Sequence, residues 1–408
     1  MSWRAAVAVV LALLASGRLA AAGPVEERPF CDGLARAVAV PLRVADAVFL
    51  RSYEPAADER GLPAPLATTA FVYDNALVAI ALVACGRVTE ATGIGEALVL
   101  AASRDRTFTD GRIRNAYRAG PIYDEAPLLP GWWDDRAGLW AEDAAQDGSS
   151  TGNVAWAALA LLTLHQATGE QTFLSAARRA MDWVMTTTSC GPDGYCGGVH
   201  GYDPQQVGLT WSSTEHNVDV YAVSRWLFRL TGEARYDDAA NRARRLLDRA
   251  FRGDHFSLGT KRDGGPADDG LLALDVQLWP WMAVPDAPRA WRDALGFAQA
   301  HLAVDGGFDF NGDRDGVWVE GTAQAAMAYR LVGDHAMHER LMKDMHADQV
   351  KSGLLNATRS RRVTTGLSID PTGTTPDFFY YRRPHLGATA WAALAETGWN
   401  PFTGARMP

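Results

Sequence analysis

Six segments of the chain are apolar on nearly every side of a helix and consist mainly of small residues. They are rich in Ala, Leu, Val and Trp, and loops rich in Gly, Pro, Asp and Ser separate them. A helix that is apolar all round is buried on all sides. The pattern therefore predicts six buried helices, at residues 73–86, 152–169, 215–232, 274–283, 320–333 and 383–398.

A second, amphipathic helix is expected after five of these segments. Sequences such as "EQTFLSAARRAMDWVM" follow a glycine, which is a good C-cap for the preceding helix, and their charged faces suit an outer layer. The sixth buried segment has no successor, whereas the amphipathic segment 31–53 has no predecessor. We expect residues 33–52 to pack against the C-terminal hairpin and close a ring.

Six buried helices inside six amphipathic ones predict an all-α fold, the (α/α)6 barrel, in a single domain over residues 23–408. The alternative is an open helical solenoid such as a tetratricopeptide array. Such arrays have a stricter period and shorter connections than the uneven spacing of these segments. We therefore favour the closed barrel, with functional residues in its long loops.

Residues 1–22 have the pattern of a secretory signal peptide. A positively charged start precedes the apolar run "AAVAVVLALLA", and Ala20 and Ala22 form a small-x-small cleavage site. The alternative is a membrane anchor, but the run is short for a bilayer span. We expect a secreted or periplasmic protein with no membrane span in the mature chain.

The four cysteines are expected to form disulfides, because an even number of cysteines in an exported chain suggests that they are paired. Cys190 and Cys196 flank the turn-rich "GPDGY", so they are the first pair expected, and Cys31–Cys85 follows by elimination. The alternative, a zinc site, lacks histidines at ligand spacing beside the cysteines.

The net charge of −9 argues against binding to nucleic acid or to an anionic membrane. No glycine-rich phosphate loop follows a predicted strand, so no nucleotide and no other cofactor is expected. We expect the mature protein to be a monomer.

Each predicted buried helix begins with a polar residue. Parallel inner helices place all six starts at one end of the barrel, near its axis. Residues of these types also cap helix N-termini, which is the simpler explanation for any one of them. Six at one rim, beside aromatic residues, favour a binding pocket. The six are Asp74, Asn153, Glu215, Asp275, Glu320 and His385.

Aromatic residues in the preceding loops suit a carbohydrate, because flat rings stack on sugars while carboxylates and amides bind hydroxyl groups. In "STEHNVD", Asp219 lies four residues after Glu215 and shares its helix face. The predicted substrate-binding residues are Trp133, Asn153, Trp211, His216, Asn217, Asp275, Trp318, Tyr380 and His385.

An exported helical toroid with acids and tryptophans at one rim resembles the six-hairpin glycosidase superfamily. The segments "STGNVAWAALALL", "STEHNVDVYA" and "WVEGTAQAAMAY" contribute to this resemblance. The superfamily includes hydrolases of glucans, mannans and unsaturated uronides, with related lyases and epimerases. The resemblance covers most of the mature chain through its architecture and implies a carbohydrate substrate. It assigns no catalytic residue.

Glycoside hydrolysis needs two carboxyl groups, one as an acid and the other as a base or nucleophile. We expect Glu215 to be the acid, with Trp211 as an apolar wall that raises its pKa. Asp74, Asp219 and Glu320 remain open as the partner.

Two other functions stay open. A polysaccharide lyase on the same fold would use His216, His385 or Tyr380 as its base. A non-catalytic glycan-binding protein of the cell envelope would keep the aromatic rim and tolerate loss of the acids.

The segment "DFNGDRDGVWVE", residues 309–320, partly matches a calcium loop. Asp309, Asn311, Asp313 and Glu320 occupy its first, third, fifth and twelfth positions. Arg314 stands at the sixth position, where the sharp turn requires glycine. We therefore expect an acidic turn that leads into a helix, and no metal site.

Overall fold

The computed structural model describes residues 28–123, 126–261, 265, 270–369, 375–376 and 378–407. The predicted signal peptide, residues 1–22, lies outside these ranges. Among the helices within them, none has the length and hydrophobicity needed to cross a membrane.

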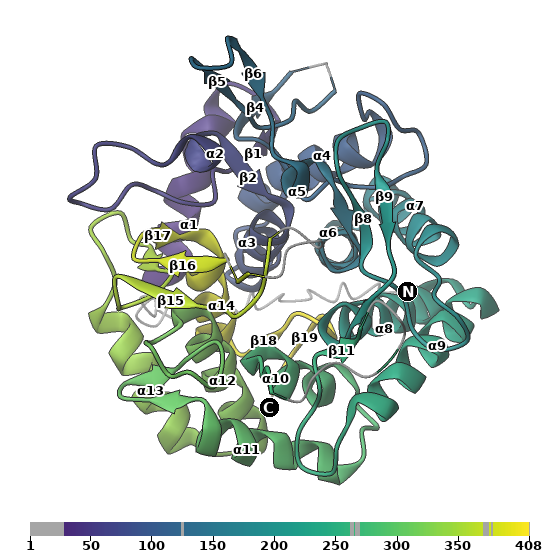
Figure 1. The fold of residues 1–408 in the computed structure, drawn as a ribbon, viewed down its shortest axis with the longest axis vertical. Helices are drawn as coiled ribbons and strands as arrows, with labels where there is room; N and C mark the ends of the chain where they lie inside the picture. Colours follow the sequence, from purple (N-terminus) through teal and green to yellow (C-terminus); the bar gives the residue numbers. More distant parts are fainter. Residues whose placement is uncertain are drawn as a thin grey trace, which may run out of the picture.

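Two concentric rings of helices form the predicted (α/α)6 barrel (Figure 1). The inner ring consists of α3 (Val72–Ala84), α6 (Thr151–Thr168), α8 (Thr214–Thr231), α10 (Leu274–Ala283), α12 (Val319–Val332) and α14 (Leu386–Thr397). The outer ring consists of α1 (Pro29–Ala39), α4 (Val88–Ser103), α7 (Gln171–Thr187), α9 (Ala234–Ala250), α11 (Asp293–His301) and α13 (His335–Ala347). Short helices α2 (Ala64–Ala67) and α5 (Ala144–Asp147) and the 3-10 turns η1 (Pro41–Arg43) and η2 (Arg289–Arg292) lie in connections.

The inner helices are buried on all sides, as their composition predicts. Small residues let them pack closely, and large aromatic rings fill the axis of the barrel. Trp156 packs edge-on against Trp279 and Trp391, with ring centroids 5.4 and 5.8 Å away. Phe402 completes this cluster at 5.4 Å from Trp156. The cluster forms the floor beneath the N-terminal end of the inner ring.

The N-terminal helix closes the ring, but it is shorter than the expected 33–52. Helix α1 ends at Ala39, because Pro41 has no backbone N–H to continue the helical hydrogen bonds. The ring of Phe30 in α1 stacks on His346 of α13 at 4.6 Å, and Gln349 Nε2 donates to Pro29 O at 2.9 Å. The two ends of the described chain therefore pack side by side.

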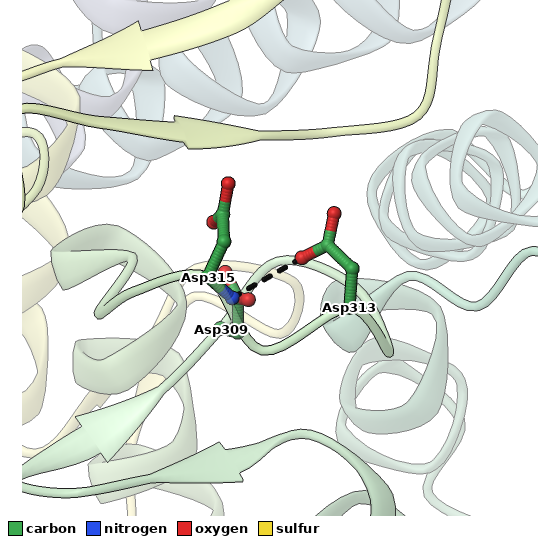
Figure 2. A group of neighbouring side chains, drawn as sticks. All are labelled: Asp309, Asp313 and Asp315. Carbon is green, nitrogen blue, oxygen red and sulfur yellow. Dashed lines mark hydrogen bonds between the residues drawn. The ribbon is translucent and has the colours of Figure 1, made fainter.

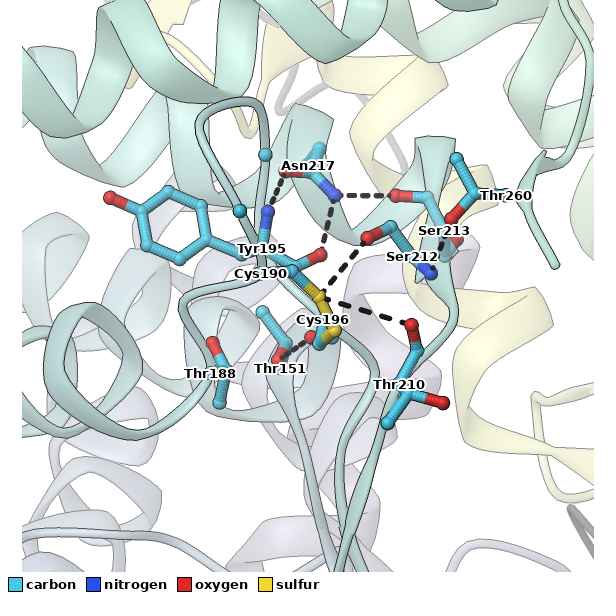
Figure 3. The surroundings of a disulfide bond; sticks show 12 residues. Thr151, Thr188, Cys190, Tyr195, Cys196, Thr210, Ser212, Ser213, Asn217 and Thr260 are labelled. Atoms are coloured by element: carbon cyan, nitrogen blue, oxygen red, sulfur yellow. Dashed lines mark hydrogen bonds between the residues drawn. A yellow bond between two sulfur atoms is a disulfide. The ribbon is translucent and has the colours of Figure 1, made fainter. Parts of the chain in front are cut away.

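Both expected disulfides are present. Cys31–Cys85 joins α1 to the end of α3, and Cys190–Cys196 closes the turn after α7 (Figure 3). The described residues include no free cysteine.

The loops contain short strands, so the expectation of an almost purely helical chain is incomplete. Two- and three-residue strands are too short to show an alternating pattern in a sequence. The described strands are β1 (Ala47–Phe49), β2 (Thr69–Phe71), β3 (Ala116–Arg118), β4 (Gly120–Ile122), β5 (Trp132–Asp134), β6 (Leu139–Ala141), β7 (Ser149–Ser150), β8 (Gly198–His200), β9 (Val207–Leu209), β10 (Ser212–Ser213), β11 (Gly259–Thr260), β12 (Ala303–Val304), β13 (Gly307–Phe308), β14 (Leu355–Asn356), β15 (Arg362–Thr364), β16 (Phe379–Tyr381), β17 (Pro384–His385), β18 (Trp399–Asn400) and β19 (Ala405–Arg406). They pair antiparallel as β1–β4, β2–β3, β5–β6, β7–β8–β9, β10–β11, β12–β13, β14–β17, β15–β16 and β18–β19.

These pairings hold the start of each inner helix in place. The segment after an outer helix pairs with the residues just before the inner helix of the same hairpin, as β3 does with β2 and β11 with β10. For the last hairpin, the segment after α1 takes this part: Tyr53 bridges His385, and Leu386 N donates to Ser52 O at 3.0 Å. The sixth hairpin is thus built from both ends of the chain.

Candidate active site

A cavity of about 240 Å³ opens at the N-terminal end of the inner ring. All six residues expected at the helix starts line it, one from each inner helix. Tyrosine and other aromatic side chains form the rest of its wall. The lining residues are Tyr53, Phe71, Tyr73, Asp74, Asn153, Glu215, Asp275, Phe310, Trp318, Glu320, Leu367, Phe378, Tyr380 and His385.

Helix capping does not account for most of these residues. Only His385 is an N-cap, accepting a hydrogen bond from Ala388 N at 3.3 Å, whereas Ser213 caps α8 in place of Glu215. The other five lie at the second or third position of their helices, where side chains can project into the pocket: Asp74, Asn153, Glu215, Asp275 and Glu320.

A tight polar cluster joins three inner helices on one side of the pocket. His385 Nε2 lies 3.2 Å from Asp74 Oδ1, and His385 Nδ1 lies 3.8 Å from Glu320 Oε2. The Tyr73 hydroxyl donates to Glu320 Oε1 at 2.6 Å and accepts from Trp391 Nε1 at 2.9 Å. A chain of hydrogen bonds thus runs from the aromatic floor to the Glu320 carboxylate.

Gly387 allows this close approach. A Cβ atom at Gly387 would lie 2.7 Å from Asp74 Oδ1 and 2.9 Å from Glu320 Oε2. Both distances are shorter than real Cβ contacts, so any side chain at this position would displace the two carboxylates.

Three carboxyl groups of the pocket have a raised pKa. Burial raises the pKa of Glu215 well above its usual value, and the charges of Asp275 and Glu320 raise it further. Burial also raises the pKa of Asp275 to about 6. For Glu320, burial raises the pKa to about 7, although His385 and the hydrogen bond from Tyr73 lower it.

The histidine responds to the same charges. Burial lowers the pKa of His385, but the negative charges of Asp74 and Glu320 outweigh this effect and raise it above its usual value. By contrast, burial lowers the pKa of His216 to about 4, which favours a neutral ring.

Asp219 lies beneath the pocket and is not among its lining residues. It is 0% exposed, one helical turn deeper than Glu215 in α8. Burial raises its pKa well above the usual value, and Glu215 and Asp275 raise it further. The predicted catalytic role of Asp219 therefore gains no support from the lining of the cavity, which does not include it.

Asn217 is a structural residue, which corrects its expected contact with substrate. Its Oδ1 accepts from Tyr195 N at 2.8 Å, and its Nδ2 donates to Tyr195 O at 3.0 Å and to Ser213 O at 2.7 Å (Figure 3). At 3.6 residues per turn, two residues rotate the side chain to the far side of the helix from Glu215.

Three other expected contacts also lie outside the lining of the cavity. Trp211 packs over Gly197, with its ring 5.7 Å from that of His216, and His216 in turn packs on Gly152. Trp133 is 58% exposed on the β5–β6 hairpin. A loop position before an inner helix therefore did not suffice to place a tryptophan in the pocket.

The aromatic wall includes residues that the sequence analysis missed. The Tyr53 ring stacks on His385 at 4.4 Å, and the Phe310 ring lies 4.9 Å from Trp318, which lies 5.5 Å from Tyr380. Phe71 and Leu367 were also missed. Phe71 comes two residues before Tyr73, so its place before a helix start was a usable signal. Tyr53 carried none, since it reaches the pocket only through ring closure.

The fold is shared with solved structures of low sequence identity. A glycosidase in complex with glucose is 13% identical, with a TM-score of 0.59 over 93% of this chain and 98% of its own. A cellobiose 2-epimerase from Bacillus thermoamylovorans is 10% identical, with a TM-score of 0.59 over 90% of this chain and 98% of its own. An α-amylase from Clostridium perfringens is 8% identical, with a TM-score of 0.58 over 92% and 99%. No family model and no curated protein matches the sequence.

Proposed function

We propose that this protein is a glycoside hydrolase in which Glu215 is the general acid and Glu320 is the second carboxylate. The observation that carries the proposal is the contrast between their surroundings. Both carboxyl groups have a raised pKa, but only Glu320 has neighbours that stabilise its ionised form, so the two can divide the acid and base roles.

Glu215 suits the acid. It is partly exposed in the pocket, and no hydrogen bond from any described residue stabilises its ionised form. Its pKa is raised by burial and by two neighbouring carboxyl groups. A protonated Glu215 can therefore donate its proton to the glycosidic oxygen of a bound sugar as the bond to the leaving group breaks.

Glu320 suits the partner. The Tyr73 hydroxyl donates to it, and His385 lies beside it, so its ionised form has two stabilising neighbours that Glu215 lacks. Ionised Glu320 can either accept a proton from water or attack the anomeric carbon. Asp74 binds the other side of the His385 ring and would hold the imidazole in place.

The wall of the cavity suits a sugar. Tyr53, Phe310, Trp318 and Tyr380 line it with aromatic rings, and Asn153 and Asp275 add polar side chains that could bind hydroxyl groups. The glycosidase and α-amylase of the same fold agree with this chemistry. The two disulfides agree with export directed by residues 1–22.

The test is incubation of the purified mature protein with a broad panel of polysaccharides and oligosaccharides. Hydrolysis releases reducing ends. A lyase also releases reducing ends, but its product is unsaturated and absorbs in the ultraviolet, whereas an epimerase changes the sugar without changing its mass. An ultraviolet-absorbing product, or a changed sugar without new reducing ends, would overturn the proposal.

Substitution then tests the two roles. Glu215→Gln and Glu320→Gln keep size and polarity, and each should lower turnover by about two to four orders of magnitude, the scale of general acid or base catalysis. Substrate binding should persist. Glu339→Gln, on the exposed face of α13, is the matched control and should leave turnover unchanged. Near-normal turnover in a folded Glu215→Gln protein would remove Glu215 from the mechanism.

A further inference from the structure

Three aspartates gather in the loop between β13 and α12, outside the cavity (Figure 2). One carboxylate oxygen from each of Asp309, Asp313 and Asp315 lies within 4.8 Å of the other two. Oxygen ligands of a calcium ion lie 2.3–2.6 Å from the metal, so two ligands on opposite sides are separated by about this distance. The spacing therefore suits one shared cation.

Asp309 has a buried oxygen without a partner. Its side chain is 0% exposed, and Oδ1 accepts from Phe310 N at 2.7 Å. Oδ2 is also buried and has no hydrogen bond from the described part of the chain. A buried carboxylate oxygen is costly unless a positive charge or a donor compensates it.

The nearby arginines leave the three carboxylates without an ion pair among the described residues. Arg314 Nε donates to His301 O at 2.9 Å, and its Nη2 donates to Ala300 O, so its charge is directed away from the aspartates. Arg362 lies over the Phe379 ring, 4.9 Å from its centroid.

The backbone also makes the turn that a calcium loop needs. Arg314 has a φ of +58°, the only left-handed non-glycine residue in the described ranges. This is the sixth position, where such loops use glycine. Glu320, matched by sequence to the twelfth position, lies instead in the cavity beside Tyr73. The residues that converge are those at the first, fifth and seventh positions, Asp309, Asp313 and Asp315. The match to a calcium loop therefore fails at its last ligand, Glu320.

We propose that Asp309, Asp313 and Asp315 bind one calcium ion. Carboxylate oxygens suit a hard cation such as Ca²⁺ better than Zn²⁺, which prefers nitrogen and sulfur ligands. This proposal replaces the sequence-based expectation of a metal-free acidic turn.

The ion would clamp one wall of the cavity. Thr364 of β15 donates its hydroxyl to Asp313 and its N–H to Asp315, the latter at 3.1 Å. Strand β15 pairs with β16, which carries Tyr380, while Phe310 and Trp318 lie on the same loop as the aspartates. A cation at the cluster would fix the two carboxylates that accept hydrogen bonds from this hairpin.

The test is calcium binding to chelator-treated protein, measured by titration calorimetry and thermal unfolding without any substrate. We expect one site and a higher melting temperature in CaCl₂. Asp309→Asn should weaken binding by roughly tenfold or more, the least expected for a lost ligand. It should not lower the melting temperature of the calcium-free protein, because it removes a buried, uncompensated carboxylate.

Two further variants complete the experiment. Asp313→Asn/Asp315→Asn changes two exposed side chains, so it keeps the test valid if Asp309→Asn fails to fold. Asp305→Asn, exposed in the β12–β13 turn, is the matched control and should bind calcium normally. No heat and no thermal shift with calcium in the unsubstituted protein would overturn the proposal. Preferential binding of Mg²⁺ would overturn the choice of calcium. Neither result depends on the proposed hydrolase activity.

Discussion

Tyr73 lies between the Trp391 indole and the Glu320 carboxylate, and this position distinguishes the two glutamates of the pocket. Glu215 and Glu320 both start an inner helix and both have a raised pKa. Only Glu320 accepts a hydrogen bond from a hydroxyl group. At the residue scale, the two glutamates therefore differ in their hydrogen-bond partners, although both lie at the start of an inner helix.

Tyr73→Phe should shift the acid side of the pH–activity profile upward. The proposed mechanism requires ionised Glu320, so activity should fall as the pH drops through the Glu320 pKa of about 7. A hydrogen bond to a charged group contributes about 1.5–3 kcal/mol, which corresponds to a shift of roughly one to two pH units. The alkaline side, where Glu215 loses its proton, should stay in place. Tyr380→Phe is the control, and an unmoved acid side in Tyr73→Phe would contradict the assignment.

Gly387→Ala should inactivate a folded protein. The added Cβ displaces Asp74 and Glu320, and a misplacement of about 1 Å can lower turnover on the order of a hundredfold. Turnover would measure the loss of activity, and circular dichroism would show separately that the protein is folded. Gly296→Ala in α11, where a Cβ meets nothing within 4 Å, is the matched control. Normal turnover in Gly387→Ala would mean that the two carboxylates need no fixed separation.

At the scale of the elements, one device fixes the start of five inner helices. In each of these helices, the side chain of the fourth residue donates a hydrogen bond to the backbone carbonyl four residues earlier. The same side chain also forms a hydrogen bond with the backbone of the loop that ends the preceding hairpin. This ties neighbouring helix starts together and holds their second and third residues toward the axis. The pairs are Asn75 with Leu50, Asn217 with Tyr195, Gln277 with Phe256, Thr322 with Phe308, and Thr389 with Leu355.

Asn217→Ala should therefore act on stability. It leaves the buried N–H and carbonyl of Tyr195 without their partner, and each unsatisfied group costs about 1–3 kcal/mol. Denaturant unfolding should show that the free energy of unfolding falls by at least the cost of one such group. Asn241→Ala on the exposed face of α9, which loses one surface hydrogen bond, should cost far less. Equal losses in the two variants would contradict the structural role of Asn217.

At the scale of the whole molecule, the barrel depends on joining its two ends. The chain supplies five complete hairpins, and the sixth combines α14 with α1. Cys31–Cys85 fastens α1 to α3, so this disulfide holds the closing helix in the ring. Cys190–Cys196 closes only a local turn.

Removing the two disulfides separately should give unequal losses of stability. Cys31 and Cys85 are 54 residues apart, whereas Cys190 and Cys196 are 6 apart. From loop-closure entropy, the Cys31–Cys85 bond should contribute about 4 kcal/mol to the free energy of unfolding and the Cys190–Cys196 bond about 2 kcal/mol. Chemical unfolding of Cys31→Ser/Cys85→Ser and Cys190→Ser/Cys196→Ser would measure both. A larger loss from the second pair would show that ring closure does not rest on the Cys31–Cys85 link.

The sequence by itself determined the barrel and most of the pocket rim. Burial of an inner helix requires apolar residues on all of its sides, so the inner helices were visible as six local patterns. Parallel packing then fixed which end of each helix meets the axis. The six polar starts could therefore be assigned to one rim without coordinates, and all six line the cavity.

Only the tertiary structure decided how these residues differ. Tyr73 and Glu320 are 247 residues apart, and His385 and Asp74 are 311 apart, so no local pattern records their contacts. Glu215, Asn217 and Asp219 share one short motif, yet they face the cavity, the neighbouring loop and the buried interior. The helical rotation of about 100° per residue fixes their relative directions, but only the packing around α8 determines what lies in each direction.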